Sequence, residues 1–228
     1  MVNPFASASN DDDGQLALSL PRSSPRYDRG SYTISDANDT AWRCVNAWWD
    51  SEELAMVICG PPSSGKTHLA HIAAERFAGV VMNDANAALP EQQNDCVAFD
   101  NLPTGNPREF LTLIEERIGA GARVILVGNG RPGDWSEGLL DLRTRIEAMP
   151  RATLNEPDEA LMRIVIAKSF QDRQIVVDQR VIDYAAPRLP RTFSAAQLFV
   201  TRADELALEK KRKISTALAQ KIINDLPV

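Results

Sequence analysis

The chain has 228 residues, 44% of them hydrophobic and 25% charged, so we expect a packed globular core with a smaller appendage. The net charge of −6 argues against a protein that coats nucleic acid by itself, because such binding depends on Lys and Arg neutralising phosphates. No apolar run reaches the length of a membrane span, and the first residues do not resemble a signal peptide. The widely spaced Cys44, Cys59 and Cys96 are typical of reduced thiols, so the sequence predicts a cytoplasmic protein with no membrane association.

Residues 1–31 are rich in Ser, Asp, Pro and Arg and are predicted to form a flexible N-terminal arm. One apolar island, "QLALSL" at residues 15–20, interrupts this arm. Extended peptides bind through alternate apolar side chains and an anchoring polar group. Such groups are present as Gln15, Leu16, Leu18 and Leu20. The arm is therefore a candidate docking peptide, and the alternative is a chance apolar patch or a stray edge strand.

From residue 32 the pattern becomes that of a globular protein, and strand and helix candidates alternate. Strands are predicted at residues 54–59, 79–82, 96–99, 123–128 and 151–155, with helices over 40–49, 67–77 and 107–118. Short, continuous apolar strands separated by helices indicate βαβ units, hence a parallel sheet covered on both faces. After Pro157 four segments have helical patterns. We predict an α/β nucleotide-binding subdomain over 32–156 and an all-helical lid over 157–228.

The segment "GPPSSGKT" matches the phosphate-binding loop pattern G-x-x-x-x-G-K-[ST] in full, between a predicted strand and a predicted helix. Backbone N–H groups and the positive end of the helix would hold the phosphates, Lys66 would reach the β- and γ-phosphates, and Thr67 would ligate Mg²⁺. The alternative is a Gly- and Pro-rich turn. The predicted nucleotide-binding residues of this loop are Gly60, Pro61, Pro62, Ser63, Ser64, Gly65, Lys66 and Thr67.

The strand "CVAF" leads into Asp100, which stands where P-loop proteins place the acid that supports Mg²⁺. The alternative is a turn residue at a strand end. The next residue is Asn101, whose amide cannot act as a general base toward an attacking water. The sequence therefore predicts a site that binds nucleotide and Mg²⁺ but hydrolyses slowly.

Two further polar residues are candidates for phosphate contacts. Asn129 follows the next predicted strand and could face the γ-phosphate, or it could be an ordinary residue of a glycine-flanked loop. Arg145 lies in "LLDLRTRIEAMP", just ahead of the last predicted strand. An Arg here could be a solvated charge, or it could stabilise the transition state in a neighbouring molecule. His68 and His71 have no third metal ligand nearby, so we expect helix packing.

These features together resemble the AAA+ ATPase domains of the replication initiator DnaA and its shorter relatives, from about Tyr32 to the C-terminus. "GPPSSGKTHLAHIAA" is similar to the Walker A segment of that family, and "LRTRIEAMP" to its box VII. The "FDN" and "QLALSL" segments are similar to the Walker B and clamp-binding motifs of the regulatory inactivators of DnaA. Ser19 stands where that family often has Pro. The resemblance implies an AAA+ P-loop fold with a helical lid.

The resemblance also implies a function and several site residues. The protein would bind ADP or ATP with Mg²⁺, dock on the DNA polymerase sliding clamp through its arm, and offer Arg145 in trans to the ATP held by DnaA. It would meet DNA only indirectly, through the clamp, since no helix-turn-helix segment follows the lid. The lid sensor of the family aligns with Ser194, and the nearest arginine is Arg191. Further nucleotide contacts implied by the resemblance are His68, Asn38 and Arg191.

Two other functions stay open on sequence grounds. An ATP-driven machine such as a helicase loader would show vigorous hydrolysis or tight binding of single-stranded DNA, and Asn101 disfavours it. A small-molecule kinase would need an Arg-rich substrate pocket. Residual hydrolysis and a homodimer that hides Arg145 are also left open.

Overall fold

The computed structural model describes residues 27–83, 95–102, 106–210 and 212–226. Within these residues it contains a five-stranded sheet of β1 (Ala55–Gly60), β2 (Val80–Met82), β3 (Cys96–Asp100), β4 (Arg123–Asn129) and β5 (Arg151–Thr153). All strand pairs are parallel, in the order β2-β3-β4-β1-β5. The predicted parallel α/β architecture is therefore confirmed. The docking segment predicted at residues 15–20 lies outside the described residues.

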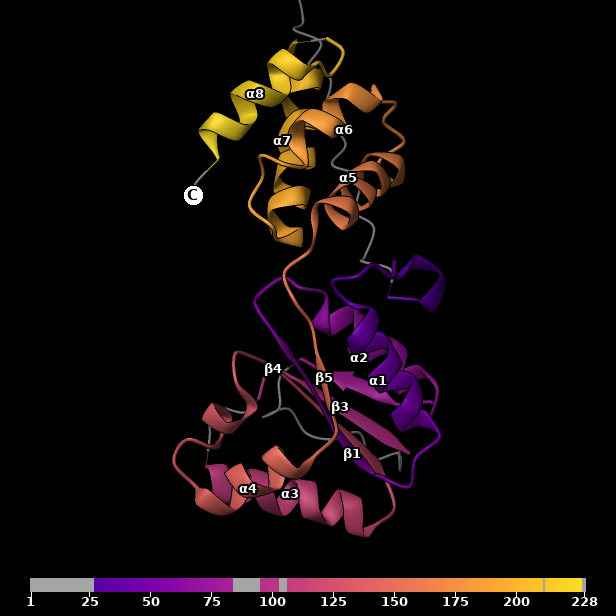
Figure 1. The fold of residues 1–228 in the computed structure, drawn as a ribbon, viewed down its shortest axis with the longest axis vertical. Helices are drawn as coiled ribbons and strands as arrows, with labels where there is room; N and C mark the ends of the chain where they lie inside the picture. Colours follow the sequence, from indigo (N-terminus) through magenta and orange to yellow (C-terminus); the bar gives the residue numbers. More distant parts are fainter. Residues whose placement is uncertain (1–26, 84–94, 103–105, 211, 227–228) are drawn as a thin grey trace, which may run out of the picture.

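Helices cover both faces of the sheet, which explains why β1 and β3 are buried along their whole length (Figure 1). α1 (Asp39–Trp49) and α2 (Lys66–Glu75) pack on one face, against Met56, Ile58 and Ile125. α3 (Pro107–Gly119) and α4 (Leu140–Ala148) pack on the other, against the alternate residues of the same strands. Successive side chains of each strand point to opposite faces of the sheet, so the core consists of two layers, one on each face.

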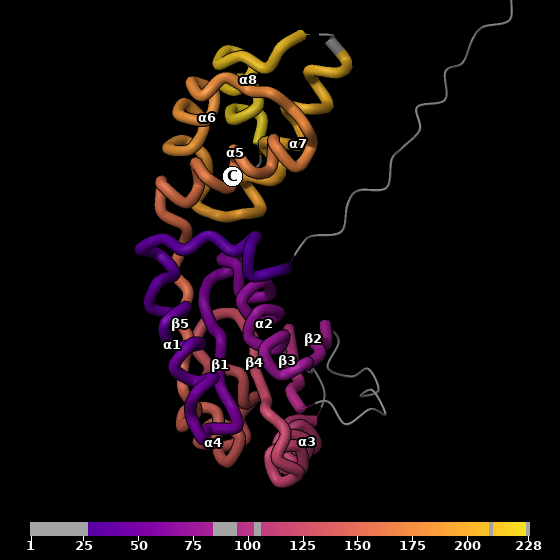
Figure 2. The backbone as a smooth tube through the Cα atoms, turned by 90° about the vertical axis from the view of Figure 1, so that its right-hand side faces the viewer, coloured from indigo at the N-terminus to yellow at the C-terminus, as the bar shows by residue number. Residues whose placement is uncertain are grey.

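The lid contains α5 (Glu159–Asp172), α6 (Gln179–Ala185), α7 (Phe193–Lys210) and α8 (Thr216–Asp225) around an apolar cluster of its own. Three of these helices begin at a capping side chain that accepts a backbone N–H: Asp158 for α5, Asp178 for α6 and Ser215 for α8. Each such cap stabilises its helix by about 1 kcal/mol. Figures 1 and 2 show the lid above the sheet, joined to it by the segment after β5. No helix of the described part has the length and apolarity of a membrane span.

Residues 27–31 were assigned to the flexible arm, and the structure instead packs them on the core. They include a short 3-10 helix, η1 (Arg29–Ser31). The Tyr27 ring stacks on His71 at 4.4 Å between centroids, and the Arg29 guanidinium lies 5.2 Å from the Trp42 ring centroid. Composition alone missed this, because the stabilising partners belong to α1 and α2.

Candidate nucleotide site

The phosphate-binding loop joins β1 to α2, and its backbone requires glycine at two points. Gly65 has φ +94°, in the left-handed region that L side chains rarely adopt. A Cβ on Gly60 would lie 2.5 Å from the Leu154 carbonyl oxygen, so no larger residue fits beside the end of β5. The loop then enters α2 at Lys66, so its N–H groups and the positive helix end face the same space. Phosphate groups are the ligands that this arrangement suits.

Lys66 is only 8% exposed and lies within the loop. Its Nζ donates a hydrogen bond to the Pro61 carbonyl oxygen over 2.6 Å. Burial lowers the pKa of Lys66 from its ordinary value, while the nearby Asp100 acts in the opposite direction. A partly desolvated ammonium group gains more from an anionic partner than an exposed one does. Lys66 therefore fits the predicted role of pairing with a polyphosphate.

Thr67 and Asp100 form the pair of oxygen ligands that Mg²⁺ would need. The Thr67 hydroxyl donates to Asp100 Oδ2 over 2.7 Å, and the carboxylate is 8% exposed. Asp100 ends β3, the strand next to β4 and hence one strand removed from β1. A hydroxyl and a carboxylate are hard oxygen donors, as Mg²⁺ prefers. Both residues therefore fit the metal role that their sequence positions predict.

Ser64 adds a second sign that the loop suits a ligand. It is 4% exposed, and its hydroxyl has no hydrogen-bond partner among the described residues. A buried hydroxyl without a partner is costly, so such groups are usually satisfied by a ligand or by water. The loop thus presents a polar group that a bound phosphate could satisfy.

Asn101 has a backbone conformation that the sequence did not reveal. It is exposed and has φ +77°, in the left-handed region. Asn adopts this conformation more readily than other residues with a Cβ, whereas Glu would be strained there. The residue after Asp100 therefore has a conformational reason to be Asn, in addition to its inability to act as a base.

Asn129 ends β4 directly beside the loop. Its Cα is paired in register with that of Gly60, and the Gly130 N–H approaches the Gly60 carbonyl oxygen at 3.4 Å. The Asn129 side chain is exposed, and its backbone carbonyl accepts a hydrogen bond from Trp135 Nε1 over 2.6 Å. The parallel sheet thus brings Asn129 to the same edge as the loop and Asp100.

The lid contacts the loop through the start of α7. The Phe193 N–H donates to the Ser63 carbonyl oxygen over 3.1 Å, and a Cβ on Gly65 would lie 3.0 Å from the Phe193 ring. Arg191 is exposed and lies two residues before Phe193. Ser194 is also exposed, and its hydroxyl lies 3.1 Å from that of Thr192. The loop contact is thus made by Phe193, and the sensor role of Arg191 stays a prediction.

Asn38 is buried and organises the segment before α1. Its amide nitrogen donates to the Thr33 carbonyl oxygen over 2.9 Å, and its amide oxygen accepts the Ser35 N–H over 2.8 Å. Both ends of the amide therefore bind the protein's own backbone. Its predicted contact with the nucleotide stays a prediction, and the structure adds a scaffolding role.

His68 follows Thr67 on α2 and contacts the 27–31 segment. Its Nε2 lies 3.1 Å from the Asp28 carbonyl oxygen, which can only accept, so Nε2 carries the proton in this contact. The same nitrogen lies 3.2 Å from the Ser31 hydroxyl, and Tyr27 and Tyr32 pack edge-on against the ring. His68 therefore fixes the N-terminal segment to the helix of the phosphate loop, and its predicted contact with the nucleotide stays a prediction.

Acidification is expected to destabilise the protein through these histidines. Burial lowers the pKa of both His68 and His71 below the ordinary value; nearby Lys168 and His71 act in the same direction on His68 and Asp28 opposes them. Because the folded state favours the neutral rings, their contribution is complete above the unfolded pKa of about 6.5 and is lost as the pH falls through the folded value. The midpoint of urea unfolding, measured between pH 7.5 and 5, should fall. A His68→Gln, His71→Gln double variant should show a weaker pH dependence, and an equal one would contradict this assignment.

Arg145 lies on α4, on the opposite face of the sheet from α2. Its side chain is exposed and forms no hydrogen bond or ion pair within the described residues. Its neighbour Arg143, by contrast, pairs with Glu147 over 2.9 Å on the same helix. An exposed, unpaired guanidinium away from the chain's own loop is suited to reaching another molecule.

The structure also brings in residues that sequence reasoning missed. The Phe193 N–H links the lid to the loop through a hydrogen bond to Ser63, and the Trp135 indole donates a hydrogen bond to the Asn129 carbonyl oxygen. Neither residue belongs to a motif. In the sequence, only Gly128, Gly130 and Gly133 near Asn129 indicated that other groups could approach the backbone closely here.

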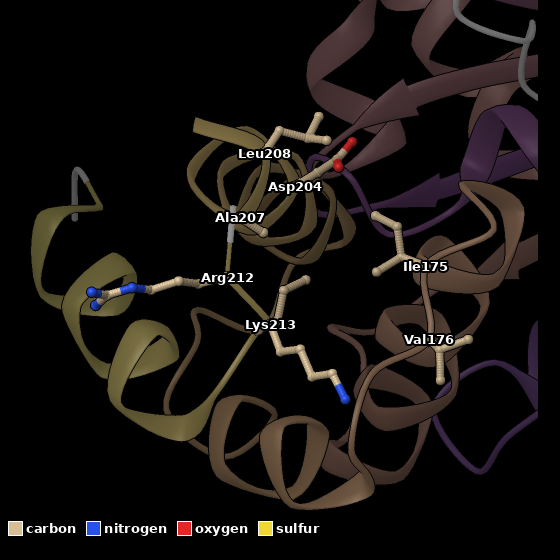
Figure 3. Close-up of a pocket in the computed structure, with 8 residues that line it drawn as sticks. Ile175, Val176, Asp204, Ala207, Leu208, Arg212 and Lys213 are labelled. Carbon is tan, nitrogen blue, oxygen red and sulfur yellow. The ribbon is translucent and has the colours of Figure 1, made fainter. Parts of the chain in front are cut away.

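A shallow groove of about 400 Å³ lies within the lid, lined by Ile175, Val176, Leu208 and Lys213 among others (Figure 3). None of its lining residues belongs to the phosphate loop.

The fold and this loop define an AAA+ P-loop architecture, and solved structures share it. Domain III of the Thermotoga maritima replication initiation protein DnaA superposes with a TM-score of 0.75 at 16% identity, covering 89% of this chain and 97% of that domain. The replication initiator DnaA bound to AMPPCP and single-stranded DNA gives 0.63 at 15% identity, covering 82% and 69%. The Thermotoga maritima RuvB Holliday junction branch migration motor gives 0.60 at 18%, covering 81% and 66%. No family model and no curated protein matches the sequence.

The fold of this chain is therefore like that of DnaA domain III. At 15–18% identity the likeness extends to the fold alone. The ligands and activities of those proteins are not properties that this likeness transfers to the present chain.

Proposed function

We propose that this protein is a negative regulator of DNA replication initiation. It binds a nucleotide, most simply ADP, with Mg²⁺ between the phosphate loop and the lid, and it docks through its arm on the DNA-loaded sliding clamp. There it supplies Arg145 to the ATP held by a DnaA molecule. The observation that carries this proposal is the pairing of a complete phosphate loop with an exposed, unpaired Arg145 on the far face of the sheet.

The chain's own site supports nucleotide retention more than turnover. Lys66, Thr67 and Asp100 supply the groups that hold phosphate and Mg²⁺. Asn101 provides no base, and its left-handed backbone would strain a Glu at this position. The nucleotide would then act as a ligand that joins loop and lid, because Phe193 at the start of α7 contacts the loop at Ser63. A ligand that binds only the folded state stabilises it, and the stabilisation grows with the logarithm of the ligand concentration above the Kd.

Arg145 would act on a partner because of what its position allows. An arginine that contacts the transferring phosphoryl group stabilises the charge of the transition state, and such residues raise rates by ~10³ to 10⁵. The partner we propose is DnaA, since the chain's fold is like that of a DnaA domain and related folds can present matching surfaces to one another. Hydrolysis of ATP on DnaA would follow, while this chain's own nucleotide persists.

The direct test mixes purified protein and DNA-loaded clamp with DnaA carrying radiolabelled ATP, and follows the ratio of ATP to ADP on DnaA. We expect hydrolysis that depends on this protein and on the clamp together. Intrinsic hydrolysis is measured in parallel with DnaA absent. Vigorous intrinsic hydrolysis or tight single-stranded DNA binding would instead favour a helicase-loader-like machine. No stimulation under any condition would contradict the proposal.

Docking on the clamp makes a separate prediction about the arm. A Gln15→Ala, Leu16→Ala double variant should lose most of its clamp binding, because it removes both the anchoring amide and the first alternate apolar side chain. Ser19→Ala is the matched control, since that position lies between the alternate leucines. Surface plasmon resonance on immobilised clamp measures both. Unchanged affinity in the double variant would refute the docking assignment, while nucleotide binding should be unaffected throughout.

A further inference from the structure

Trp135 lies against the end of β4, in the 3-10 helix η2 (Pro132–Ser136). Its indole Nε1–H donates to the Asn129 carbonyl oxygen over 2.6 Å. The ring covers Gly128, where a Cβ would lie 2.7 Å from both Cε2 and Cζ2. Any side chain at residue 128 would displace the indole. Trp135 is therefore fixed to the strand end by both a hydrogen bond and a close packing contact.

The same short helix is joined to α4. The Leu139 N–H donates to the Ser136 carbonyl oxygen over 2.9 Å, just before α4 begins, and the buried Ser136 hydroxyl donates to Gly133 over 3.1 Å. The Glu147 carboxylate of α4 lies over Gly133, where it also pairs with Arg143. η2 and α4 thus form one packed unit, and Arg145 belongs to it.

Leu142 and Ile146 pack α4 on the sheet, and Trp135 joins this unit to the edge of the nucleotide site. Asn129, whose carbonyl it holds, stands in register with Gly60 of the phosphate loop. We propose that Trp135 is a positioning residue, which holds α4 against the end of β4 and so sets where Arg145 is presented. This rests on the proposed role of Arg145 in trans. The indole itself contacts neither the partner nor its nucleotide.

Two variants test this from opposite sides of the contact. Trp135→Phe keeps an aromatic ring over Gly128 but removes the N–H donor, and Gly128→Ala keeps the indole but pushes it off the strand. Each should lower the maximal rate of hydrolysis stimulated in the partner ATPase ~10-fold, because small displacements of a catalytic group reduce rates strongly. The protein concentration that gives half of that maximum should not change, and neither should the affinity for ADP. Combined, the two changes should reduce the rate by less than the product of their single effects.

A second readout does not depend on activity. Amide hydrogen exchange in Trp135→Phe should speed up over η2 and α4, residues 132–148, and stay at wild-type rates in α7. A residue with a merely structural role would raise exchange across the α/β subdomain or weaken ADP binding as well. Either of those patterns would overturn the proposal.

Arg145→Ala separates this inference from the proposed function. If Arg145→Ala abolishes stimulation while Trp135→Phe and Gly128→Ala remain at wild-type rates, the positioning role is wrong and the trans role stands. If Arg145→Ala stimulates fully, the trans role fails, and the positioning role of Trp135 fails with it.

Discussion

Replacing Arg145 by alanine should lower the stimulated hydrolysis of ATP on DnaA by ~10³ or more, in line with the effect of arginines that act in trans in phosphoryl transfer. The loss should appear in the maximal rate, because the guanidinium is needed in the transition state. Clamp binding and ADP binding should stay at wild-type levels, since Arg145 is exposed and lies on the face opposite α2. Single-turnover assays with DnaA preloaded with ATP measure the rate directly.

The matched control is Arg143→Ala on the same helix. Arg143 is also exposed, but Glu147 holds it in an ion pair over 2.9 Å. A surface pair of this kind contributes ~0 to 1 kcal/mol to stability, so the helix should tolerate its loss. We expect Arg143→Ala to retain stimulation within a few-fold. If the two variants behave alike, the effect of Arg145 reflects total charge on α4 and the specific role is refuted. Arg145→Lys should rescue little, because an ammonium lacks the planar fork of donors.

Replacing Lys66 by alanine should lower nucleotide affinity by ~10²-fold. Hydrogen bonds to charged groups contribute about 1.5–3 kcal/mol, and Lys66 is the cation placed within the phosphate loop. At an ADP concentration 100 times the wild-type Kd, bound nucleotide should stabilise the wild type by about 2.7 kcal/mol and the variant by only about 0.4 kcal/mol. Thermal unfolding with and without Mg²⁺-ADP measures the difference, and isothermal titration calorimetry gives the affinities.

Lys221→Ala is the control for this experiment, because Lys221 is an exposed lysine on α8. It should bind ADP like the wild type. Full ADP-dependent stabilisation in Lys66→Ala would contradict the assignment of the loop as the nucleotide site. Loss of stability in Lys66→Ala without ligand would instead show a structural role, since its Nζ also holds the Pro61 carbonyl.

Local sequence patterns determined the parts of this protein whose chemistry lies within a few consecutive residues. The loop of Gly60–Thr67 follows from the glycines that its tight backbone needs and from the Lys and Thr that end it. The parallel sheet follows from short runs that are apolar on both faces and alternate with amphipathic helices. Thr67 and Asp100 were each predicted to serve Mg²⁺ from their own motifs, and the hydrogen bond between them is a finding of the structure.

Contacts between distant segments could be decided only by the tertiary structure. Phe193 contacts Ser63, 130 positions away, because the start of α7 lies against the phosphate loop. Trp135 contacts Asn129 because η2 packs against β4. The left-handed backbone of Asn101, the anchoring of residues 27–31 on α2 and the solvent-facing side of Arg145 are of the same kind. Such features depend on strand register, on packing and on the relative orientation of distant elements. The spacing of residues along the chain does not indicate any of these. The sequence therefore determined which groups can hold a nucleotide, and the fold decided which neighbours hold those groups in place.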